Sequence, residues 1–96
     1  MLTARYAGHG SIWIEEHQAD PPSAREVQIA VAYTGLCGTD LHILHGHLDA
    51  RITTPQVIGH EMSGTIAAIG DQVEGWSVGD PVTVMPLSWD GTCPAC

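Results

Sequence analysis

Residues 27–34 carry the feature that most restricts the fold of this chain, a strict alternation of two kinds of side chain. Large apolar or aromatic residues occupy every second position, and small or polar residues lie between them. A period of two over eight residues predicts a β-strand. The predicted strand runs directly into Gly35-Leu36-Cys37, so the thiol of Cys37 is expected where a rigid element ends. That position suits a metal ligand, because the scaffold fixes the direction of the thiol.

Two short motifs concentrate groups that bind metals. Cys37-Gly38-Thr39-Asp40-Leu41-His42 places a thiol, a hydroxyl, a carboxylate and an imidazole within six residues, and Gly59-His60-Glu61 adds an imidazole and a carboxylate. Thiolate and neutral imidazole are strong ligands for first-row metals, and Zn²⁺ favours such mixed sites. The long spacer between Cys37 and His60 does not suit a zinc finger and predicts a site assembled by tertiary folding. For either residue alone, a buried cysteine or a core histidine is the simpler interpretation.

The rest of the chain predicts a mostly β domain. A short helix is expected to be capped by Thr39 or Asp40 and to end near His45, before a left-handed Gly46. Gly64 and Gly70 indicate close approach of backbones. We therefore expect a small barrel or sandwich with one short helix at the metal site. Its other strands are predicted at residues 3–7, 11–15, 63–69 and 82–85, with a turn at Gly8-His9-Gly10 joining the first two.

The composition allows one small domain and argues against two classes of partner. Eleven Asp and Glu residues face only three Arg, there is no Lys, and the net charge is −8. Nucleic acids and anionic membrane surfaces require clustered positive charge, so neither is expected as a partner. No stretch has the apolar length of a signal peptide or a membrane span, which favours a cytoplasmic location. The three cysteines are interpreted as metal ligands or free thiols rather than a disulfide framework.

These residues together resemble the zinc-dependent medium-chain alcohol dehydrogenases, in their amino-terminal GroES-like catalytic domain. Gly59-His60-Glu61 followed by Gly64, Gly70 and Val73 is similar to the zinc signature of that family, and residues 37–42 are similar to its first-ligand segment. Residues 78–82 resemble its turn before a barrel strand. The resemblance covers essentially the whole chain, residues 1–96. The run after Cys37 is more similar to the threonine, sorbitol and butanediol dehydrogenases than to the ethanol-oxidising enzymes.

The resemblance implies a role for each residue of the two motifs. Cys37 and His60 would ligate a catalytic Zn²⁺, and Glu61 would be a ligand in some branches and a supporting carboxylate in others. Asp40 would hold the second ring nitrogen of His60. Thr39 would contact the oxygen of an alcohol or polyol substrate and begin a proton relay that continues through His42. The implied reaction is hydride transfer from that small-molecule substrate to NAD or NADP.

The end of the sequence departs from the family pattern. Asp90, Cys93 and Cys96 resemble the start of a structural zinc lobe, but Asp90 stands where the family has a cysteine and no fourth ligand follows. A reduced C-x-x-C tail without metal is the alternative. No G-x-G-x-x-G pattern is present, so no dinucleotide-binding domain is expected. We expect residues 1–96 to be a GroES-like domain incomplete at its C-terminal end, inactive alone, with NAD or NADP bound only in a full-length protein.

A non-enzymatic GroES-like module that uses zinc for binding or assembly remains the alternative function. Thr39 beside Cys37 favours the enzyme, since a purely structural zinc site needs no relay hydroxyl. The zinc-free quinone reductase branch lacks the ligands that Cys37, His60 and Glu61 would supply. An incomplete barrel leaves sheet edges and apolar side chains exposed, which predicts self-association into a homo-oligomer.

Overall fold

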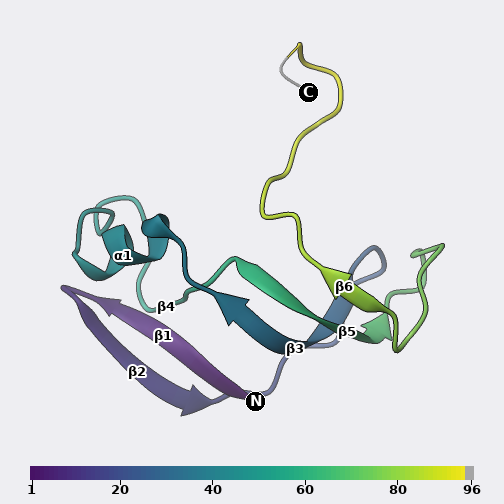
Figure 1. The fold of residues 1–96 in the computed structure, drawn as a ribbon, viewed down its shortest axis with the longest axis horizontal. Coiled ribbons are helices and arrows are strands. Elements are labelled where there is room, and N and C mark those ends of the chain that lie inside the picture. The colour runs from purple at the N-terminus through teal and green to yellow at the C-terminus, as the bar shows by residue number, and fades with distance from the viewer. Residues whose placement is uncertain (95–96) are drawn as a thin grey trace.

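The protein folds into two small antiparallel sheets and one short helix (Figure 1). The computed structural model describes residues 1–94. The strand order is β2-β1-β4 in the first sheet and β3-β5-β6 in the second. Within the described residues neither sheet closes into a barrel, and the prediction of a mostly β fold with one short helix is confirmed. The elements are β1 (Leu2–Gly8), β2 (Ser11–Glu16), β3 (Val27–Gly35), α1 (Gly38–Leu44), β4 (Gln56–Val57), β5 (Glu61–Ile69) and β6 (Pro81–Thr83).

The first sheet is built on the predicted hairpin of β1 and β2. The chain turns at His9-Gly10, where both residues have positive φ, at 54° and 74°. This backbone conformation suits glycine and is tolerated by a short polar residue. The two-residue strand β4 then pairs with Arg5 and Tyr6 on the other edge of β1.

The second sheet rests on the long pairing of β3 with β5. The ladder runs from Val27 opposite Ile69 to Gly35 opposite Glu61, with irregularities at two places along β3. Gly64 lies so close to β3 that a Cβ there would overlap the carbonyl oxygen of Ala30. A Cβ at Gly70 would likewise overlap the carbonyl oxygen of Ser23. The predicted close approach at both glycines is therefore confirmed, and it explains why a side chain is absent there.

The apolar core is small. Tyr6 and Ile66 are the hydrophobic residues that the described structure buries fully, at 0% and 2% exposure. The alternation in β3 continues to Tyr33, yet Val31 and Tyr33 are 42% and 78% exposed. The second half of β3 therefore forms a strand, as its period of two predicts. Among the described residues, however, no second layer packs over it. The exposed apolar side chains also include all three tryptophans, Trp13, Trp76 and Trp89.

The buried Tyr6 joins β1 to the loop after α1 through a polar contact. Its hydroxyl donates a hydrogen bond of 2.6 Å to Asp49 and accepts one of 3.1 Å from the N–H of Gly10. The hydroxyl of Tyr6, helped by the backbone N–H of His9, lowers the pKa of the Asp49 carboxyl. The same bond to Asp49 raises the pKa of Tyr6. This contact fastens the segment containing α1 to the first sheet.

The structure corrects the prediction of the helix cap. The N-cap residue is Cys37, not Thr39 or Asp40, and α1 ends at Leu44 with His45 as its C-cap. Asp40 lies at the third helical position, from which its carboxylate reaches back to the N–H of Cys37. The sequence suggested Asp40 as a possible cap, whereas in the structure Asp40 accepts the N–H of the cap residue and so completes a capping box. Gly46, with φ of 80°, is left-handed as predicted.

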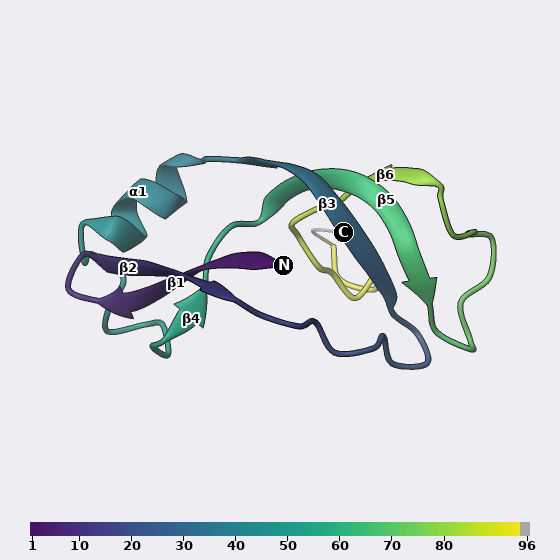
Figure 2. The same ribbon diagram turned by 90° about the horizontal axis from the view of Figure 1, so that it is seen from below.

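Two further strand boundaries differ from their predictions. The strand predicted at residues 63–69 begins earlier, at Glu61, because the ladder with β3 extends to Gly35. The strand predicted at residues 82–85 covers only Pro81–Thr83. Beyond β6 the chain runs away from both sheets (Figure 1). In Figure 2, the view from below, this segment overlaps β3 and β5 because it extends along the line of sight.

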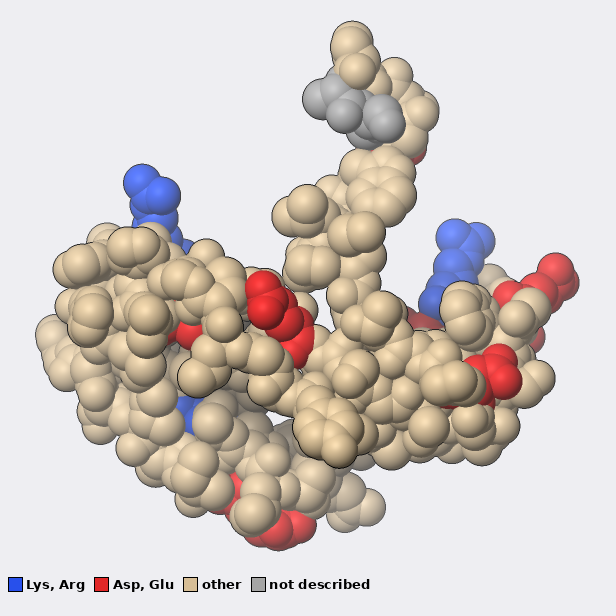
Figure 3. Space-filling view, in the orientation of Figure 1, with Lys and Arg blue, Asp and Glu red and all other residues tan. Residues whose placement is uncertain are grey.

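The surface carries few positive groups. On the face drawn in Figure 3, the positively charged side chains, all of them Arg, lie far apart from one another and form no patch. The three cations of the sequence are Arg5, Arg25 and Arg51, and Arg5 donates a hydrogen bond of 2.6 Å to Glu15. Among residues 1–94, no helix has the length and apolar character needed to cross a membrane.

Candidate metal centre

The last pair of the β3–β5 ladder brings the two sequence motifs together. Gly35 pairs with Glu61, so Cys37 leaves the end of one strand while His60 enters the other. The turn before His60 depends on Gly59, whose φ of 106° other residues rarely adopt. Gly35 also leaves space for Glu61, because a Cβ at Gly35 would lie 3.0 Å from the Glu61 Oε2 atom. The antiparallel register therefore joins residues more than twenty positions apart in the sequence.

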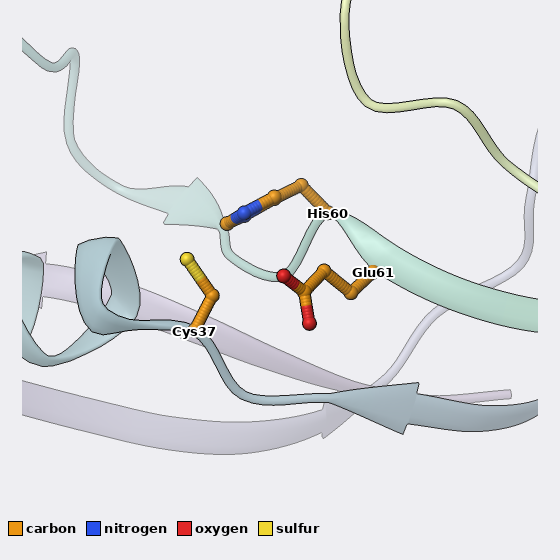
Figure 4. Close-up of side chains that lie close together, drawn as sticks. All are labelled: Cys37, His60 and Glu61. Atoms are coloured by element: carbon orange, nitrogen blue, oxygen red, sulfur yellow. The ribbon is translucent and has the colours of Figure 1, made fainter.

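Three candidate ligand groups converge at this point. One ligand atom from each of Cys37, His60 and Glu61 lies within 4.8 Å of the others, and the three side chains project into the same space (Figure 4). Ligands of a closed tetrahedral Zn²⁺ site lie about 3.3–3.7 Å apart, as follows from metal–ligand distances of about 2.0–2.3 Å. The observed spread is slightly wider. Glu61 is exposed and can rotate inward, so the chemistry and spacing of the set fit zinc.

Cys37 is held in place by the beginning of α1. Its Sγ accepts a hydrogen bond of 3.3 Å from the N–H of Thr39, and its own N–H donates one of 2.9 Å to Asp40 Oδ2. These two hydrogen bonds tie the residue at both its backbone and its side chain to the first turn of α1. The helix thus orients Cys37 toward the centre.

Asp40 is a buried carboxylate that contacts two of the three candidate ligand residues. Its side chain is almost completely buried, at 1% exposure, while one oxygen is occupied by the N–H of Cys37. The other oxygen, Oδ1, has no hydrogen-bond partner among the described residues and lies 3.7 Å from Nδ1 of His60. A buried carboxylate oxygen without a partner is costly, and the nearby imidazole is the group that can relieve this cost. This arrangement leaves the other ring nitrogen of His60 free to face a metal.

The two predicted relay residues occupy different surroundings. Thr39 is exposed in the first turn of α1, close to Cys37 through the N–H bond to Sγ. His42 is exposed one turn later and lies against His47, with the two Nδ1 atoms 3.3 Å apart. The contact between His47 and His42 was not identified from the sequence. The spacing of the two histidines across Gly46 was the signal that could have revealed this contact.

The C-terminal candidates form a local turn. Asp90 Oδ1 accepts hydrogen bonds from the N–H groups of Thr92 and Cys93, at 2.9 and 3.2 Å. These bonds keep Asp90 and Cys93 near each other. Cys96 lies outside the described residues, so the predicted structural zinc site stays a prediction.

Comparison with known proteins identifies the family of this chain. The family profile described as "Alcohol dehydrogenase GroES-like domain" matches residues 23–96. The chain belongs to this alcohol dehydrogenase family. The predicted resemblance is thereby confirmed, and the fold is that of a GroES-like domain.

Three relatives illustrate this membership. Over all 96 residues the chain is 51% identical to 2-dehydro-3-deoxy-L-galactonate 5-dehydrogenase from Pseudoalteromonas atlantica, of which it covers 28%. Over 93% of its length it is 39% identical to sorbitol dehydrogenase from Halalkalibacterium halodurans, of which it covers 26%. A crystal structure of a putative zinc-binding dehydrogenase from Sinorhizobium meliloti bound to NADP superposes with a TM-score of 0.85 at 30% identity, over 99% of this chain and 27% of the other. This GroES-like chain spans about a quarter of the length of its relatives.

Proposed function

We propose that residues 1–96 form the zinc- and substrate-binding part of an NAD(P)-dependent dehydrogenase acting on a small alcohol or polyol. The observation that carries the proposal is the convergence of Cys37, His60 and Glu61, with the buried carboxylate of Asp40 behind His60. The names of the sorbitol and galactonate dehydrogenase relatives support a polyhydroxylated substrate. A purely structural zinc site would not need an exposed hydroxyl such as that of Thr39 next to its thiolate ligand.

In this proposal Cys37, His60 and Glu61 hold the zinc ion. The metal, when bound, supplies Lewis-acid polarisation of a substrate oxygen. Asp40 fixes the ring of His60 so that one nitrogen faces the carboxylate and the other faces the centre. The N–H of Thr39 donates to the sulfur of Cys37 and helps to hold its direction. An exposed Glu61 can approach and withdraw, which would leave room for substrate beside two better-fixed ligands.

The proton from the substrate hydroxyl leaves through Thr39 and His42. A threonine hydroxyl can accept a proton and donate its own at the same time, so it transfers charge without becoming charged for long. Imidazole accepts and releases protons near neutral pH, which makes exposed His42 a suitable exit to solvent. Both residues lie on α1, one turn apart, and so move together with Cys37 at the N-cap.

The cofactor and the assembly belong to the same proposal. Hydride transfer requires NAD or NADP, which a dinucleotide-binding domain would hold, and the 96 residues contain no pattern for one. We further propose a cytoplasmic location. Self-association is expected because large apolar side chains such as Tyr33, Leu36 and Trp89 are more than 60% exposed. Light scattering over a range of protein concentrations tests this, and a monomer throughout would contradict it.

The first experiment measures zinc per chain on tag-free protein. Wild type is compared with His60→Ala and with Cys93→Ser, which alters only the C-terminal cysteine pair. We expect zinc to be lost in His60→Ala and retained in Cys93→Ser. Zinc lost only in Cys93→Ser, or absent from the wild type, would contradict the proposed centre.

A cobalt-substituted sample distinguishes an open catalytic site from a closed structural one. Imidazole or an alcohol analogue should change the visible absorption of cobalt bound at an open position. An unchanged spectrum, with cobalt bound through Cys37, would favour the non-enzymatic module instead.

A further inference from the structure

The C-terminal end of α1 brings two imidazole rings into contact outside the centre described above. The N–H of His47 donates to the carbonyl of His42 at 3.1 Å, and the N–H of Gly46 donates to the carbonyl of Ile43 at 3.0 Å. With Gly46 left-handed at φ 80°, this pair of bonds is a Schellman motif. In that motif the side chains of the two residues joined by the outer bond meet, and they are usually apolar. Here both are histidines.

The geometry of the two rings is that of a pair of metal ligands. The Nδ1 atoms of His42 and His47 lie 3.3 Å apart, and the ring centroids are separated by 5.6 Å. Two nitrogens that each lie about 2.0–2.1 Å from one tetrahedral ion are themselves about 3.3–3.4 Å apart. The backbone motif brings the two side chains together, so an ion would find both nitrogens already within range of each other.

A third imidazole, that of His45, lies near the ring of His47. The ring centroid of His45 lies 5.7 Å from that of His47, and all three histidines are exposed to solvent. Neutral imidazole binds the later first-row metals well. Its affinity for Cu²⁺ is higher than its affinity for Ni²⁺, and Zn²⁺ is also bound well. The acidic chain, with its net charge of −8, further favours a cation.

We propose that His42 and His47 form a second metal site, which takes a divalent late transition-metal ion at the end of α1, with the exposed ring of His45 beside it. The site uses none of Cys37, His60 and Glu61. It shares His42 with the proposed proton relay, but metal binding there can be tested without any dehydrogenase activity. The alternative is a simple hydrogen bond, in which one ring carries its proton on Nδ1 and the other does not. Occupation by metal would displace that proton and join the two nitrogens through the ion.

The test uses Ni²⁺ as the probe and calorimetry as the readout. The reference protein is the 96-residue chain without thiols, so that only imidazole sites are measured; its substitutions are Cys37→Ser, Cys93→Ser and Cys96→Ser. We expect one Ni²⁺ binding event in this reference, lost in His47→Gln and in His42→Gln. The event should persist in His17→Gln, which removes an exposed histidine outside α1, and in His60→Gln.

Three results would overturn the proposal. They are no Ni²⁺ binding in the reference protein, binding that survives both His42→Gln and His47→Gln, and binding that is lost in His60→Gln. If the thiol-free chain does not fold, the wild type is titrated with Ni²⁺ and followed by NMR. Paramagnetic broadening of the ring protons of His42 and His47 before those of His17 supports the site. Equal broadening of all exposed histidines contradicts it.

Discussion

Asp40 lies directly beside His60 at the candidate centre, with Oδ1 of the buried carboxylate 3.7 Å from Nδ1 of the ring. The second oxygen of Asp40 accepts the N–H of Cys37 at 2.9 Å. One carboxylate therefore orients two of the three proposed ligands, one through the backbone and one through the side chain. This explains why a charged group is 1% exposed in a domain with so small a core.

Replacing Asp40 with Asn should weaken zinc binding without unfolding the chain. The amide oxygen can still accept the N–H of Cys37, but the charge that stabilises and orients His60 is lost. Loss of such a supporting group typically lowers metal affinity by about 10–100-fold. Competition between the protein and a chromogenic chelator measures this change. Equal zinc affinities of Asp40→Asn and wild type would show that Asp40 serves only the helix cap.

Replacing Tyr6 with Phe should change how stability depends on pH. The hydroxyl of Tyr6 is the largest cause of the lowered pKa of Asp49. A carboxyl with a lowered folded pKa stabilises the native state above its usual value of about 3.9, and this contribution is lost as pH falls through the lowered value. In Tyr6→Phe the pKa of Asp49 returns toward the usual value. The variant should therefore be less stable at neutral pH and lose less further stability on acidification.

Urea unfolding from about pH 7 down to about pH 3 measures this effect. Tyr33→Phe is the matched control, because Tyr33 is 78% exposed and should leave both the stability and its pH dependence unchanged. If Tyr6→Phe and Tyr33→Phe have the same acid profile, the bond to Asp49 does not contribute to stability.

Much of the fold followed from short patterns in the sequence. The period of two in residues 27–34 gave β3, and the turn at His9-Gly10 gave the first hairpin. Both signals are local, because a strand's period and a turn's backbone conformation depend on neighbouring residues alone. The burial of β3 was not predictable in this way. Val31 follows the alternation but is 42% exposed, because burial depends on whether another layer packs above it.

The candidate centre was predicted as a set of residues, but its support was only partly foreseen. Cys37, His60 and Glu61 were identified by their ligand chemistry, and the structure brings them within 4.8 Å. The role of Gly35 was not visible, since it depends on its pairing with Glu61 across the sheet. The thiol cap by Cys37 was also missed, because Ser, Thr, Asp and Asn are the usual N-cap residues.

A methyl group at Gly64 should destabilise the second sheet. Gly64 lies in the central strand β5, opposite Val31 on one side and Val82 on the other. Besides overlapping the carbonyl oxygen of Ala30, an added Cβ would lie 3.0 Å from the Cα of Val31. The strand cannot move away without disturbing both ladders, so Gly64→Ala should cost about 1–3 kcal/mol of unfolding free energy or more.

Gly38→Ala is the control for this substitution. A Cβ at Gly38 meets no atom within 4 Å, and alanine is the better helix former at the first residue of α1. Thermal unfolding of the metal-free proteins should therefore show a clear loss for Gly64→Ala and none for Gly38→Ala. Equal stabilities would mean that β3 and β5 do not approach as closely as the structure places them.

Two substitutions of Cys37 should separate its role as a helix cap from its proposed role as a ligand. Serine keeps a side-chain acceptor for the N–H of Thr39 and is among the best N-cap residues, whereas alanine removes the acceptor. In the metal-free state Cys37→Ser should be as stable as wild type, and Cys37→Ala should lose about 1 kcal/mol. Both variants should lose the bound zinc, because neither supplies a thiolate. Chemical unfolding in the presence of a chelator, together with zinc analysis, measures the two effects separately. Zinc retained in Cys37→Ser would remove the thiol from the proposed ligand set and leave it as a cap alone.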